Sequence, residues 1–140
     1  MKIMAGLLES PEGVAAQQRA VEEARLHGGD LLLVTYVPSP HDAGSSRHYD
    51  EDRQRALRDA EGVAAQLRET GLQVEIRAPI GANSPADALL QAAKDDAVDL
   101  IVIGIRRRSR VGKLIVGSNA QEILLAADAP VLAVKPEVGG

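Results

Sequence analysis

Cysteine, tryptophan and phenylalanine are absent from this sequence, and its two tyrosines are the only aromatic residues. The absence of cysteine excludes a disulfide framework, a thiolate metal site and a cysteine nucleophile. The scarcity of aromatic rings removes the platforms on which proteins stack single-stranded bases, and the formal charge of −4 opposes a polyanionic ligand. We therefore expect no nucleic-acid partner.

Long hydrophobic runs are absent as well. No segment approaches the roughly 20 apolar residues that cross a bilayer, and the apolar stretch near the amino terminus meets charge at Glu9, too early for a signal peptide. We expect a cytoplasmic protein without a membrane partner. The 140 residues suit one domain, residues 1–140, with an aliphatic core. A chain of this size buries roughly two-thirds of its unfolded surface.

Five short apolar segments predict β-strands. Two of them are uninterrupted, as in strands covered on both faces, and one alternates apolar with polar residues, as in a strand near a sheet edge. In chain order the segments are residues 2–8, 31–37 (uninterrupted), 72–78 (alternating), 98–104 (uninterrupted) and 130–136.

The segments between the strands predict four helices. Ser10–Pro11 and Ser84–Pro85 each combine an N-cap residue with proline at the first helical position. Ser118 and Gln121 fit a capping box, in which the two residues satisfy each other's backbone donors. Residues 38–52 are rich in Pro, Ser, Asp and Gly and predict a mobile loop before the second helix. The predicted helices cover residues 11–27, 48–70, 85–96 and 118–127.

Strict alternation of strands and helices with short connections predicts an α/β fold: a single three-layer domain with a five-stranded parallel sheet and helices on both faces. In such a sheet, ligands bind outside the carboxyl ends of the strands, where the strand order reverses. The longest candidate loop at that edge begins with Gly104 at a strand end and leads into the last helix.

This loop lies within GIRRRSRVGKLIVGSN, residues 104–119, which hold five cations and no acidic residue. It lacks both standard phosphate fingerprints, because Arg107 and Leu114 break the P-loop pattern around Gly112 and G-x-G-x-x-G is absent after the first strand. Glycines beside a helix start still make an anion site, since free backbone amides and the helix dipole favour negative charge. The plainer alternative is a tight turn, a helix cap and a solvated charged surface.

The order and spacing of several segments resemble those of the universal stress protein family over nearly the whole chain. The segments are ESPEG after the first strand, GGDLLLVTYV, PIGANSPADALLQAAKDDAVDLIVIG and VGKLIVGSNAQEILLAADAPVLAVKP. The resemblance implies the strand order 3-2-1-4-5, adenine-nucleotide binding and a homodimer formed through the last strand, here residues 130–135.

Nucleotide-binding members of that family carry the pattern G-x2-G-x9-G-[ST], which Gly104, Gly117 and Ser118 match while Arg107 replaces the second glycine. The family also places a nucleoside-binding Asp where this chain has Leu8, followed by Glu9. The resemblance and the loop chemistry together nominate as nucleotide-binding residues Gly104, Arg107, Gly112, Gly117, Ser118, Asn119, Leu8, Glu9 and, beside adenine, Tyr36.

The resulting hypothesis is a dimeric stress-response protein that binds ATP or AMP, with or without Mg²⁺, and hydrolyses it little or not at all. No residue is nominated as catalytic or as a metal ligand. A second hypothesis is a nucleotide-free dimeric interaction protein whose basic loop, residues 104–113, docks an acidic partner; Leu8 and Arg107 favour it. A third, a receiver-like phosphoacceptor, needs acidic residues at the strand end where Leu7 and Leu8 stand.

Overall fold

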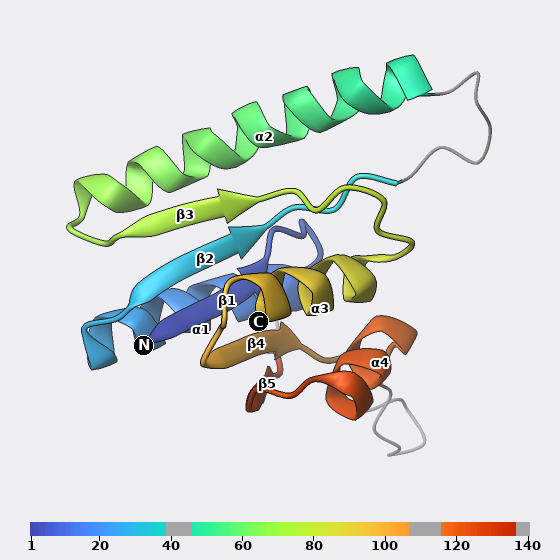
Figure 1. Cartoon of the computed structure of the whole chain (residues 1–140). Coiled ribbons are helices and arrows are strands. Elements are labelled where there is room, and N and C mark those ends of the chain that lie inside the picture. Colours follow the sequence, from blue (N-terminus) through green and yellow to red (C-terminus); the bar gives the residue numbers. More distant parts are fainter. Residues whose placement is uncertain (39–45, 107–115, 137–140) are drawn as a thin grey trace.

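Strands and helices alternate along the chain as predicted (Figure 1). The computed structural model describes residues 1–38, 46–106 and 116–136. Each element begins within two residues of its predicted start. The elements are β1 (Lys2–Gly6), α1 (Pro11–His27), β2 (Asp30–Val34), α2 (Ser46–Glu69), β3 (Val74–Arg77), α3 (Pro85–Asp95), β4 (Leu100–Gly104), α4 (Ser118–Ala126) and β5 (Val131–Val134).

The sheet is entirely parallel, and its strands lie in the order β3-β2-β1-β4-β5. Helices α1 and α2 pack against one face of the sheet, and α3 and α4 pack against the other. This confirms the predicted α/β class, the three layers and the strand order. The order reverses between β1 and β4, so the chain leaves these neighbouring strands in opposite directions and opens a crevice at their carboxyl ends.

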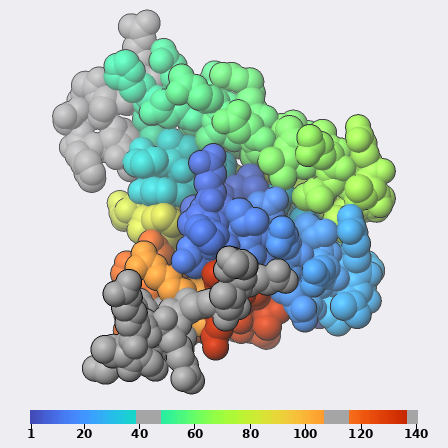
Figure 2. Space-filling view, turned by 180° about the vertical axis from the view of Figure 1, so that it is seen from behind, coloured from blue at the N-terminus to red at the C-terminus, as the bar shows by residue number. Residues whose placement is uncertain are grey.

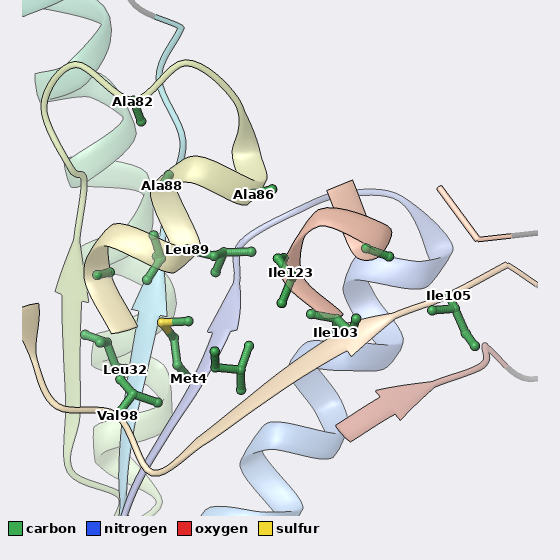
Figure 3. Close-up of a cluster of buried hydrophobic side chains, with 14 residues drawn as sticks. Met4, Leu32, Ala82, Ala86, Ala88, Leu89, Val98, Ile103, Ile105 and Ile123 are labelled. Carbon is green, nitrogen blue, oxygen red and sulfur yellow. The ribbon is translucent and has the colours of Figure 1, made fainter. Parts of the chain in front are cut away.

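The core is aliphatic, as the shortage of aromatic residues predicted. Ala16, Ala20 and Ala24 form a stripe along α1 and are at most 3% exposed, which lets the helix backbone lie close against the sheet. The opposite layer combines buried alanines of α3 with larger side chains, and Leu89 and Ile103 pack there in one cluster (Figure 3). Figure 2 shows the face on the α1 side, with α1 (blue) lying between α2 (green) and β5 (red).

The predicted caps of two helices are confirmed. The backbone amide of Gly13 donates to the Ser10 hydroxyl at 3.1 Å, and that of Asp87 donates to the Ser84 hydroxyl at 3.0 Å. Gly28 ends α1 in the left-handed conformation, with φ of 60°. The Ser10 and Ser84 side chains thus accept hydrogen bonds from amides that have no acceptor within the first helical turn.

Helix α2 begins earlier than its sequence predicts, and the predicted loop over residues 38–52 is wrong for its second half. Residues 46–52 are helical, whereas residues 39–45 lie outside the described part of the chain. Tertiary contacts explain the extension: Tyr49 is buried and its hydroxyl accepts a hydrogen bond from the Gly81 amide at 3.2 Å. Over the described ranges, no helix combines the length and the apolarity needed to cross a membrane.

Candidate functional site

A cleft of about 340 Å³ opens at the carboxyl ends of β1 and β4, where the strand order reverses. This volume lies within the range of small-molecule sites, roughly 300–1,000 Å³. Residues from the first turns of α1, α3 and α4 form its walls. Leu89, Ile103 and Ile123 contribute apolar lining from three different elements, and Figure 3 shows them together.

The amino terminus of α4 reaches this cleft without a side-chain cap. Gly117 occupies the N-cap position and no side chain of the described residues caps it. Gly117, Ser118 and Asn119 all line the cleft. In this arrangement the first amides of α4 have no acceptor within the helix, and the helix dipole adds positive potential. The helix start therefore provides backbone donors and positive potential of the kind that favours an anion.

The predicted capping box at Ser118 is wrong. The extended backbone of Gly117, with ψ of 159°, makes Gly117 the N-cap residue and Ser118 the first residue of the helix. The Gln121 amide accordingly donates to the Gly117 carbonyl at 2.9 Å. The exposed Ser118 hydroxyl is thus available to a ligand instead of the helix.

The two family-motif glycines that the structure describes serve different purposes. A Cβ built on Gly104 would lie 2.0 Å from the Glu12 carbonyl oxygen, because the first turn of α1 crosses the end of β4 at that point. A Cβ on Gly117 would meet no described atom within 4 Å, and the φ of Gly117 is an ordinary −62°. Packing explains glycine at position 104. It does not explain glycine at position 117, which faces the cleft.

Asn119 joins two helix starts at the cleft. Its side-chain oxygen accepts a hydrogen bond from the Ala86 amide at 2.9 Å, so the side chain satisfies a donor in the first turn of α3. Asn119 also lines the cleft. The side chain of this nominated nucleotide-binding residue therefore forms a hydrogen bond between α3 and α4, which also pack together in one hydrophobic cluster.

The three residues nominated for the nucleoside lie in different places. Leu8 is 43% exposed and lines both the cleft and a neighbouring hollow between α1 and α2. Glu9 lines that hollow and another beside β5 instead of the cleft. Tyr36 is half-buried, packs against the core beneath α3 and α4, and is not part of the cleft lining.

The remaining nominated residues, Arg107 and Gly112, lie outside the described part of the chain. Arg106 is exposed and is the cation among the described residues that line the cleft. Sequence reasoning did not nominate Gly13, although a Cβ on it would lie 2.5 Å from the Leu8 Cβ. A glycine in the first turn of a capped helix was the available signal, since glycine there permits close approach of another backbone segment.

The fold and the cleft define a doubly wound α/β protein in which an uncapped helix start lines a cleft at the switch point. Residues 1–135 match the family model described as the Universal stress protein family. The chain belongs to this family.

Relatives and solved structures agree with this assignment. A universal stress protein of Mycolicibacterium smegmatis is 38% identical over 134 residues, which cover 96% of this chain and 97% of the relative. A solved universal stress protein from Archaeoglobus fulgidus is 32% identical with a TM-score of 0.74, covering 96% of this chain and 98% of that one. A second structure from Archaeoglobus fulgidus, in complex with dAMP, is 25% identical with a TM-score of 0.63 and the same coverage.

Proposed function

We propose that this chain is a cytoplasmic stress-response protein that binds an adenine nucleotide, ATP or AMP, in the cleft between β1 and β4. The observation that carries the proposal is the uncapped start of α4, which presents backbone amides to the cleft. A phosphate group is the ligand that such a helix end favours. The related structure with bound dAMP supports adenine as the base.

Different residues of the cleft are proposed to bind the phosphate and the nucleoside. The amides that follow Gly117 and the Ser118 hydroxyl hold phosphate, and Arg106 attracts the anion over a longer distance. Arg107 and Gly112 are proposed to add contacts from the loop. The apolar lining, Leu8 included, receives the nucleoside. We propose little or no hydrolysis, because no acid–base constellation is recognisable in the sequence.

We propose that two copies associate through the free edge of β5. Ile101 and Ile105 donate to the carbonyls of Pro130 and Val134 at 2.9 and 2.8 Å, so the even-numbered residues of this segment face β4. The backbone of Val131 and Ala133 therefore points away from β4. The sheet ends at β5 in the described residues, leaving this edge available to a second strand.

Release of bound nucleotide and thermal shift test the binding proposal. Freshly purified protein is denatured and the supernatant is examined for adenine nucleotide; refolded or nucleotide-free protein is then titrated with ATP, AMP and dAMP, with and without Mg²⁺. A ligand at 100 times its Kd adds about 2.7 kcal/mol of stability. Absence of both released nucleotide and a shift at millimolar ligand contradicts the proposal.

A nucleotide-free interaction protein remains the second candidate, and Leu8 is the observation that favours it. A 43% exposed leucine stands at the end of β1, where a nucleoside-binding family member carries a carboxylate. In that case the basic loop docks an acidic protein. Salt-sensitive binding to an acidic polypeptide such as polyglutamate, together with no thermal shift from nucleotide, separates this candidate from the first.

A further inference from the structure

The free edge of β3 differs from that of β5. Leu31 and Thr35 of the β2 segment donate to the carbonyls of Gln73 and Arg77, each at 2.9 Å. Odd-numbered residues of β3 therefore face β2. The intervening residues turn their carbonyl and amide groups away from the sheet, because backbone groups alternate in direction along a strand.

Each of the three outward carbonyls at this edge accepts a hydrogen bond from an arginine side chain. Two of these arginines come from α2, which runs beside β3 in Figure 1, and one comes from β3 itself. The bonds run from Arg68 to Val74 (Nε at 3.1 Å and Nη2 at 2.8 Å), from Arg77 to Ile76 (Nη1 at 2.8 Å) and from Arg53 to Ala78 (Nε at 2.9 Å).

Acidic neighbours hold two of these guanidinium groups in place. Arg77 pairs with Asp96 at 3.0 Å and with Glu75 at 2.6 Å, and the hydrogen bond to Asp96 is the main cause of its raised pKa. Arg68 pairs with Glu61. Acidic partners thus hold Arg68 at the start of the edge and Arg77 at its middle, while Arg53 bonds to the carbonyl of Ala78, one residue beyond β3.

The β5 edge has no such cover in the described residues. Val131 and Ala133 point their backbone outward, and none of the described side chains donates to their carbonyls. Ala133 is also exposed. An approaching strand would therefore meet outward carbonyls already bonded to arginine at the β3 edge, and outward carbonyls without a described side-chain donor at the β5 edge.

We propose that Arg53, Arg68 and Arg77 close the β3 edge to strand addition, so that the sheet grows through β5 alone and assembly stops at two copies. A strand that added to β3 would lie about 4.8 Å away and would need the outward carbonyls as acceptors. The guanidinium groups occupy both that space and those acceptors, and positive charge at an edge opposes pairing. Were both edges open, β3 of one copy could pair with β5 of the next and build an open filament.

The test removes two of the arginines in a protein whose β5 edge is blocked. Ala133→Pro removes an outward amide of β5 and leaves the hydrogen bonds between β5 and β4 in place. Any further association of copies in this background must then use another surface, whether or not the wild-type protein forms the proposed dimer. Into this background we introduce Arg53→Met and Arg68→Met together. The matched control is Arg55→Met with Arg58→Met, which changes the charge of the same helix equally but removes no bond to a β3 carbonyl.

Light scattering after size exclusion measures the result over increasing protein concentration. The edge variant is expected to rise about twofold or more in weight-average mass, while the control keeps the mass of the background. An edge variant that stays folded by circular dichroism and keeps the background mass overturns the proposal. If the double variant does not fold, Arg53→Met and Arg68→Met are measured singly in the same background. Growth in either supports the proposal, and unchanged mass in both folded singles overturns it.

Discussion

The Glu12 carbonyl oxygen lies 2.0 Å from the point where a Cβ on Gly104 would stand. The first turn of α1 therefore rests directly on the end of β4. This contact makes Gly104 a packing residue as well as a residue of the cleft.

Alanine at Gly104 is expected to destabilise the protein by about 1–3 kcal/mol, because backbone must move to admit the methyl group. Gly117→Ala is the matched variant: its Cβ meets no described atom, so it should cost only about 0.5 kcal/mol, the preference for glycine over alanine at an N-cap. Chemical denaturation measures both. If ligand passes close to Gly117, Gly117→Ala weakens nucleotide binding. Equal destabilisation by both variants would contradict the conclusion that packing requires glycine at position 104 but not at position 117.

Ser118→Ala is expected to leave stability within about 0.5 kcal/mol, since the hydroxyl caps no helix. Nucleotide affinity should fall by about 1 kcal/mol, the value of one lost hydrogen bond. Ser84→Ala serves as the control, because Ser84 does cap α3 and its loss should cost about 1 kcal/mol of stability. Destabilisation by Ser118→Ala with unchanged affinity would restore the capping interpretation.

Asn119→Ala removes the acceptor for the Ala86 amide and should lower the free energy of unfolding by about 1 kcal/mol. Asn119→Asp keeps an acceptor at the same place while adding negative charge beside the anion site. Its stability should remain near wild type and its affinity for nucleotide should fall. Calorimetric titration and denaturation, run on both variants, separate the two effects. Equal affinity in wild type and Asn119→Asp would show that phosphate binds elsewhere.

Ala133→Pro is expected to convert the proposed dimer to a monomer. The substitution removes an outward amide from the β5 edge, whereas the bonds from Ile101 and Ile105 to the β5 segment remain. Analytical ultracentrifugation measures the mass, and the melting temperature reports on folding. A variant that remains dimeric would place the dimer interface on another surface.

Gly28 and Ala97 provide a pair of tests for helix ends. Both have positive φ, 60° and 51° respectively. Gly28→Ala should destabilise by about 1 kcal/mol, because a Cβ is strained at this φ. The added Cβ would meet no described atom within 4 Å, so no steric clash adds to this cost. Ala97→Gly relieves the same strain at an entropic cost and should stabilise by about 0.5 kcal/mol. Thermal and urea unfolding measure the signs, and a destabilising Ala97→Gly would contradict this account.

Local sequence patterns were sufficient to predict which segments form strands and which form helices. Uninterrupted apolar segments predicted β2 and β4, alternation predicted that β3 lies near an edge, and Ser-Pro pairs predicted the starts of α1 and α3; the structure confirms each. The order of the strands came from the family resemblance, because alternation alone does not distinguish one doubly wound order from another.

The sequence by itself determined which segments are strands and helices, since periodicity and capping act within a few residues of the chain. Only the tertiary structure decided the start of α2, which depends on Tyr49 contacting Gly81. It likewise decided that Gly117 and not Ser118 begins α4, and that Asn119 bonds to α3. These outcomes depend on hydrogen bonds between residues that are far apart in the sequence, and such contacts cannot be predicted from a local sequence pattern.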